Sequence, residues 1–232
     1  MVKHTVHSYD HDLDLLVNAM NEMMNHVHEE LVIAGNNWQT PTVEAVTEAR
    51  EIDKTVNKLD TQIEQRATNL LALRQPMGID LRFIVSALKL IITIERMGDL
   101  AKNTAKRACN YARQIDADLL NDFENLMKKI ISMHESISQN LNLKKENVPY
   151  NQICEFDDEV DMITRLIIQK IEDKMVACTD KSSIEIYMNF IFTIKNIERV
   201  GDCITKIARI CHYIKTGERL GKHQYRVRVE EH

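Results

Sequence analysis

The sequence contains few residues that interrupt helices. It has only six glycines and three prolines in 232 residues. Because glycine and proline most often end or break a helix, so few of them predict long helices joined by few turns. No segment has the alternating pattern of a strand, so the sequence predicts an all-α protein.

Disulfide, secretion and membrane signals are also missing. The cysteines are odd in number and include no Cys-x-x-Cys pair, so we expect free thiols in a reducing compartment. They are Cys109, Cys154, Cys178, Cys203 and Cys211. Residues 1–15 carry histidines and aspartates where a signal peptide needs an apolar stretch. The most apolar run, 88–94, contains Lys89 and is far shorter than the roughly 20 residues of a spanning helix. We therefore expect a cytoplasmic protein without membrane insertion.

Signatures of catalysis and of nucleic-acid binding are absent as well. The formal charge is −5, which gives no electrostatic reason to expect nucleic acid. The sequence has no Gly-rich phosphate loop, no Gly-x-Ser-x-Gly and no His-Glu-x-x-His. No histidine follows a glutamate by three residues, which excludes the Glu-x-x-His pattern of di-iron carboxylate bundles. We expect no enzymatic activity.

Apolar residues at three- and four-residue spacing predict six helices. The first runs from about Asp10 and ends at Gly35, and the second begins with Thr40 as N-cap and Pro41 in its first turn. The second helix is expected to end at about Arg74, and the third to run from Asp80 to about Gln114. The fourth begins after Asp116, and the fifth follows a break at Asn147–Pro149. The sixth runs from about Ser182 to Thr216, where Gly217 ends it.

The chain also repeats itself. The segment from Ile94 to Asp99, Ile-Glu-Arg-Met-Gly-Asp, recurs about a hundred residues later as Ile-Glu-Arg-Val-Gly-Asp. An acidic segment in the preceding helix repeats at nearly the same offset. The duplication predicts two pseudo-symmetric, antiparallel three-helix bundles, over 1–115 and 116–217, followed by a tail over 218–232.

The repeated segments carry oxygen side chains four residues apart, which place both members of a pair on one face of a helix. The pairs are Asp53 with Asn57 and Glu95 with Asp99 in the first half, and Asp157 with Asp161 and Glu198 with Asp202 in the second. Two facing pairs would form a cage of four oxygen ligands, suited to Mg, Mn or Fe, with Zn also compatible. The glycine inside each motif would let a metal, its waters or another backbone approach closely. The alternative is a solvated acidic strip, with Asp99 paired to Lys102 and Asp202 to Lys206.

Together these features resemble the PhoU family of phosphate-signalling proteins over nearly the whole chain. The resemblance rests on the paired Glu-Arg-x-Gly-Asp segments, on Arg74-Gln75-Pro76 followed by Asp80-Leu81-Arg82, and on the acidic segment of each middle helix. It implies a PhoU-like fold of two spectrin-like three-helix bundles, with Fe or Zn clusters on the eight residues above and Asp80 and Arg82 in support.

The resemblance also implies a function. Members of the family are negative regulators of phosphate uptake and of the phosphate-starvation response. They act as cytoplasmic adaptors at the inner face of the membrane, between the ATPase of the phosphate-specific ABC transporter and a sensor histidine kinase. A homodimer is expected.

One departure from the family pattern concerns the residue four positions after each motif aspartate. Asn103 keeps the usual asparagine, whereas Lys206 replaces it and could occupy the second site in place of metal. Two other functions remain open. One is a metal-independent helical scaffold that binds partners, and the other, with less support from the residues, is a metal-dependent helical-bundle enzyme.

Overall fold

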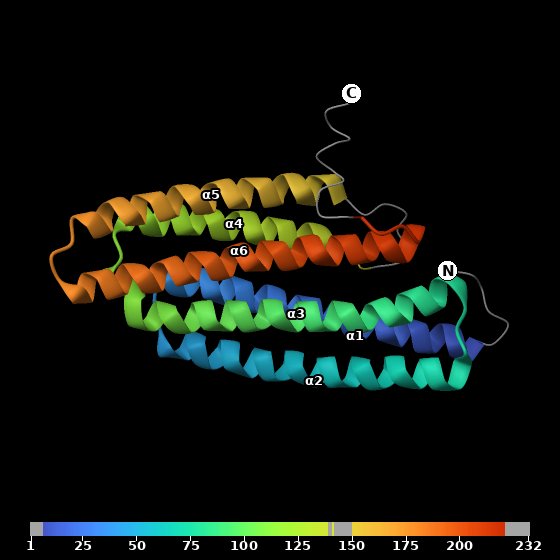
Figure 1. The fold of residues 1–232 in the computed structure, drawn as a ribbon. Helices are drawn as coiled ribbons and strands as arrows, with labels where there is room; N and C mark the ends of the chain where they lie inside the picture. The colour runs from blue at the N-terminus through green and yellow to red at the C-terminus, as the bar shows by residue number, and fades with distance from the viewer. Residues whose placement is uncertain (1–6, 139–140, 142–149, 221–232) are drawn as a thin grey trace, which may run out of the picture.

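Six long α-helices lie side by side along one direction (Figure 1). The computed structural model describes residues 7–138, 141 and 150–220, and these contain no strand. The helices are α1 (His7–Gln39), α2 (Val43–Arg74), α3 (Gly78–Tyr111), α4 (Ala117–Ser138), α5 (Tyr150–Val176) and α6 (Lys181–Thr216), with a short 3-10 helix, η1 (Ala112–Gln114), after α3. The all-α prediction is confirmed. The expected break at Asn147–Pro149 and most of the expected tail lie outside the described residues.

Local chemistry explains both ends of α6 and the start of α2. The side chain of Asp180 accepts a hydrogen bond from the backbone N–H of Ser183 and begins α6, and Gly217 ends it with φ 79°, as predicted. The predicted start of α2 is wrong by two residues. Thr42, not Thr40, is the N-cap, and its Oγ1 accepts from the backbone N–H of Ala45. Pro41 therefore precedes the cap instead of lying in the first turn.

Gly35 does not end the first helix, contrary to the prediction. Helix α1 continues for another turn to Gln39. A Cβ at Gly35 would lie 3.4 Å from Cε of Met127 on α4. That distance is an ordinary van der Waals contact, so packing does not require glycine here, and the helix interior tolerates it at a cost of about 1 kcal/mol.

The helices form two bundles that pack against each other. Helices α1, α2 and α3 contact one another, as do α4, α5 and α6. The bundles meet where α3 lies along α6 and α1 along α4, and α2 and α5 lie on opposite outer sides (Figure 1). Equivalent helices of the two halves thus face each other, which confirms the pseudo-symmetric arrangement.

One apolar core extends through both bundles. Part of this core is an aromatic cluster of Trp38 from α1, Phe123 from α4 and Phe190 from α6, all fully buried, with ring centroids 5.0–5.9 Å apart. The indole Nε1–H of Trp38 donates to the backbone oxygen of Thr104 on α3, 3.1 Å away. Four helices from both halves therefore meet at one aromatic cluster.

Two further observations concern the cysteines and the length and hydropathy of the helices. All five cysteines are free, two of them buried and three half-buried. No helix in the described part of the chain combines the length and apolar character needed to cross a bilayer.

Candidate functional site

The first group of predicted ligands lies where α2 faces α3. Nζ of Lys102 is 2.8 Å from Oδ1 of Asp53 and 2.6 Å from Oδ1 of Asp99, so one ammonium joins a carboxylate from each helix. Asp53 is nearly enclosed, with 13% of its side chain exposed. Burial alone would lower the pKa of Lys102, but its hydrogen bonds to both aspartates raise it above the usual value. The position expected for a metal is thus crossed by a lysine salt bridge.

The other two predicted ligands of this half lie beside that bridge. The Asn57 side chain is exposed, and its Nδ2 donates to Oδ2 of Asp53 over 3.3 Å. Glu95 is half-buried, and burial followed by the charge of Asp99 raises the pKa of its carboxyl. The four side chains therefore lie in one region, where α2 faces α3.

The sequence analysis missed a fourth carboxyl at this site, that of Glu30 on α1. Glu30 is fully buried, and neither of its oxygens has a hydrogen-bond partner. Burial, followed by the charge of Asp53, raises the pKa of Glu30 to about 8, with Lys102 opposing and Asp99 adding to the shift. We therefore expect Glu30 to be protonated at neutral pH, which avoids an isolated buried charge.

The motif glycines make room for carboxylates from neighbouring helices. A Cβ at Gly98 would lie 2.6 Å from Oε2 of Glu30, whereas at Gly201 the nearest atom, Oδ1 of Asp157, would be 3.4 Å away. Met133 occupies the position that corresponds to Glu30 in the second half. We expected a metal, its waters or another backbone beside each glycine. The structure instead places a side-chain carboxyl from another helix there, more closely at Gly98 than at Gly201.

This difference predicts unequal effects of the same substitution. Gly98→Ala should lower the free energy of unfolding by about 1–3 kcal/mol, because the buried Glu30 has little space to move. Gly201→Ala should be neutral or stabilise by up to about 1 kcal/mol, because its Cβ fits and alanine favours helix. Urea unfolding followed by circular dichroism measures both. The double variant Glu30→Ala/Gly98→Ala should lose less free energy of unfolding than the sum of the losses in the two single variants. Equal effects of Gly98→Ala and Gly201→Ala would contradict this account.

The second group of predicted ligands lies between α5 and α6. Burial, followed by the charge of Asp161 and then that of Asp202, raises the pKa of Asp157 to about 6. Burial, Glu198 and Asp202 likewise raise the pKa of Asp161, with Arg165 opposing. These four carboxylates repel one another, and no ammonium joins them across the two helices in the described part of the chain. Among the residues that the structure describes, Glu198 pairs only with Lys195 on its own helix, at 2.6 Å.

The expectation that Lys206 occupies this second site is not met. Lys206 is exposed and forms no ion pair with a described residue, and the lysine bridge is found in the other half, at Lys102. Across the described residues, no three Asp, Glu, His or Cys side chains converge closely enough to hold one metal ion. Metal binding at either group therefore requires side chains to change rotamer.

Comparison with known proteins assigns the family. The family model of the PhoU domain matches twice, over residues 20–108 and 123–211. The chain belongs to the PhoU family. A Caulobacter vibrioides protein named phosphate-specific transport system accessory protein PhoU homolog is 31% identical over 223 residues, 95% of each chain. A protein of the same name from Rhizobium meliloti is 28% identical, over 92% of this chain and 90% of its own.

Solved PhoU structures share the fold. The crystal structure of PhoU from Pseudomonas aeruginosa superimposes with a TM-score of 0.82 at 23% identity, over 90% of this chain and 100% of that one. The phosphate transport system regulatory protein PhoU from Streptococcus pneumoniae gives 0.78 at 23% identity, over 92% and 99%. None of these four relatives is named as an enzyme. The two sequence relatives are named as accessory proteins of a phosphate-specific transport system.

Two other features of this PhoU chain lie away from the acidic groups. Asp80 is in the first turn of α3, about 28 Å along the helix from Asp99, and Arg82 lies against Gly217. At the distance observed, Asp80 cannot support the first group.

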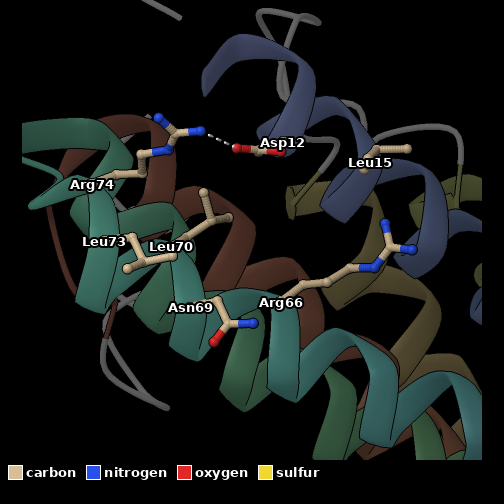
Figure 2. Close-up of a pocket in the computed structure, with 7 residues that line it drawn as sticks. All are labelled: Asp12, Leu15, Arg66, Asn69, Leu70, Leu73 and Arg74. Atoms are coloured by element: carbon tan, nitrogen blue, oxygen red, sulfur yellow. Dashed lines mark hydrogen bonds and ion pairs between the residues drawn. The ribbon is translucent and has the colours of Figure 1, made fainter. Parts of the chain in front are cut away.

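An open groove of about 320 Å³ lies between α1 and α2, towards the C-terminal end of α2. Figure 2 shows Arg66 and Arg74 reaching from α2 toward α1, where Nη2 of Arg74 is 3.0 Å from Oδ2 of Asp12. Leu73 at its edge is 78% exposed. The groove has no acidic cluster, so we do not assign it to the metal site.

Proposed function

We propose that this PhoU protein is a non-enzymatic negative regulator of phosphate uptake and of phosphate-starvation signalling. It acts at the inner face of the membrane as a cytoplasmic adaptor between the transporter ATPase and a sensor histidine kinase. The observation that carries the proposal is the PhoU domain matched in both halves, together with full-length relatives named as accessory proteins of phosphate transport.

Exposed apolar side chains support action through partners. Leu81 and Val85 are 41% and 38% exposed on α3, and the corresponding Ile184 and Met188 are 38% and 39% exposed on α6. Exposed apolar side chains at matched positions of a repeat are suited to protein contacts. They support the proposed contacts with the transporter and the kinase, and a homodimer, without requiring catalysis.

A reporter of the phosphate-starvation response tests the regulatory role. In cells that lack this protein, the reporter should be active even at high phosphate, because repression is lost. The intact gene should restore repression. A reporter that stays silent at high phosphate in the deleted strain would contradict negative regulation.

We also propose that the acidic groups bind a metal such as Fe, Zn, Mn or Mg, the second group more tightly than the first. A cation would relieve the repulsion among Asp157, Asp161, Glu198 and Asp202. In the first group, formed by Asp53, Asn57, Glu95 and Asp99, a metal must displace the ammonium of Lys102. The donor sets fit a hard or borderline cation in both halves, and the lysine makes the difference in affinity.

Elemental analysis and titration of protein purified without an affinity tag test this order. Asp157→Asn/Asp202→Asn should abolish the tighter binding, because it removes two of four carboxylates, whereas Asp53→Asn/Asp99→Asn should leave it intact. Lys102→Ala should strengthen binding at the first group by removing the competing ammonium. If neither wild type nor Lys102→Ala contains bound metal, the metal proposal is eliminated.

The same variants separate the adaptor from its alternatives. If the Asp157→Asn/Asp202→Asn variant represses the reporter as well as wild type, a metal-independent scaffold is the better description. Turnover of phosphate esters or oxidation of a substrate by the metal-loaded protein, lost in that variant, would favour an enzyme.

A further inference from the structure

A hollow next to the first acidic group has the opposite electrostatic character. It measures about 280 Å³ and is lined by Arg50, Asp53 and Lys54 of α2 and by Lys102, Asn103 and Lys106 of α3. Four cationic side chains thus surround one carboxylate, a formal charge of +3 for the lining. The hollow lies on the N-terminal part of α2 and does not include any residue of the groove in Figure 2.

The cations in this hollow differ in how far they are already neutralised. Lys54 is 2.7 Å from Glu51, and Lys102 is held by Asp53 and Asp99. Arg50 and Lys106 are exposed and have no carboxylate within ion-pair distance among the residues that the structure describes. Two positive charges on facing helices therefore remain available to a ligand.

The internal repeat offers a comparison within the same chain. The positions that correspond to the six lining residues are Cys154, Asp157, Asp158, Thr205, Lys206 and Arg209. These include two acids and two bases, so their formal charge is zero. The positive charge in the first half is therefore specific to that half and is not a consequence of the shared fold.

We propose that this hollow binds a phosphate-type oxyanion, either free inorganic phosphate or the phosphate group of a small metabolite. The guanidinium of Arg50 can donate two parallel hydrogen bonds to two oxygens of the anion, and the ammonium of Lys106 supplies a second charge from the opposite helix. The amide of Asn103 adds a neutral donor. Two unpaired cations balance the charge of a phosphate dianion. The site rests on these residues alone and does not depend on a regulatory role or on metal binding.

Isothermal titration of the full chain with inorganic phosphate at about 0.15 M salt tests the proposal, since diffuse attraction between exposed charges is largely screened there. We expect one phosphate per chain in wild type and at least about tenfold weaker binding in Arg50→Ala/Lys106→Ala, because two charge-assisted contacts are lost. Both side chains are exposed, so the variant should keep its helical circular dichroism.

A matched control removes one lysine and one arginine at positions of α2 that lie outside the hollow. Lys58→Ala/Arg66→Ala takes one exposed lysine and one exposed arginine from outside the hollow, Arg66 being part of the groove in Figure 2. It should bind phosphate as wild type does. Equal losses in the two double variants, or no saturable binding by wild type at millimolar phosphate, would overturn the proposal.

A second arm identifies the source of the oxyanion. AMP presents the same phosphate chemistry on a larger molecule and should compete with inorganic phosphate at this site. Tighter binding of inorganic phosphate than of AMP assigns the site to the free ion, and the reverse assigns it to a phosphate ester. AMP binding that survives in Arg50→Ala/Lys106→Ala would count against the site.

Discussion

Replacing Trp38 with alanine is expected to lower the free energy of unfolding by about 3–5 kcal/mol, the range for truncating a large aromatic in a packed core. Trp38 is fully buried against Phe123 and Phe190, and its indole hydrogen bond reaches Thr104. The substitution leaves a cavity at the place where both bundles meet. We therefore expect one cooperative transition at a lower urea concentration.

Circular dichroism at 222 nm is the appropriate measurement, because Trp38 is the chain's only tryptophan and its fluorescence disappears with it. Trp38→Phe is the matched control. It keeps an aromatic ring and loses the donor to Thr104, so its cost should be smaller. A Trp38→Ala midpoint equal to that of wild type would contradict a central role for this cluster, as would two separate transitions.

Replacing Glu30 with methionine is expected to stabilise the protein by about 1–3 kcal/mol at pH 8, by removing a buried carboxyl that lacks hydrogen bonds. Methionine already occupies the corresponding position, Met133, which is also fully buried. Urea unfolding at fixed pH measures the change.

The sign of the pH dependence follows from the raised pKa. The pKa of Glu30 is about 8 in the folded protein, against 4.5 for a freely solvated glutamate, so the native state holds a proton that the unfolded chain releases between these limits. Stability from this group is full below about pH 4.5 and declines as pH rises through 8. The groups facing Glu30 are Asp53 from α2, Asp99 and Lys102 from α3, and Glu29 on its own helix. The advantage of Glu30→Met over wild type should therefore grow from pH 5 to pH 9.

Glu30→Gln separates ionisation from polarity. Its amide cannot lose a proton, so this variant should show the weak pH dependence of Glu30→Met while keeping an unsatisfied polar group. Parallel curves for wild type and both variants between pH 5 and pH 9 would show that Glu30 is not protonated in the fold.

The sequence predicted the helices correctly, but only some of the predicted helix ends agree with the structure. Gly217 ends α6 because its positive φ is a local requirement that glycine meets. Gly35 has no such requirement, because it lies inside α1 without a positive φ, and the residue type alone does not show whether a glycine ends a helix or lies within it. Thr40 and Thr42 are equally good caps by type, and only the path of the chain between α1 and α2 selects Thr42.

The same limit applies to the site. The pairing of Lys102 with Asp99 on the same helix was foreseen as an alternative to a metal site, but the contact of Lys102 with Asp53 on the facing helix was not. Lys102 and Lys206 both follow a motif aspartate within one turn, yet only Lys102 reaches a carboxylate on the facing helix, Asp53. Glu30 was missed although it lies three residues after the buried Val27, at a position of the apolar stripe. Its neighbour Glu29 is 55% exposed, so the pair resembles an ordinary polar face.

The contact of α1 with α4 and of α3 with α6 has an evolutionary consequence. Equivalent elements that meet in this way have the signature of a two-fold interface between identical subunits. A one-repeat ancestor would have needed a second copy to cover the face that now holds Trp38. Because both repeats lie in one chain, corresponding positions need not carry the same residue, and Glu30 and Arg50 in the first repeat correspond to Met133 and Cys154 in the second.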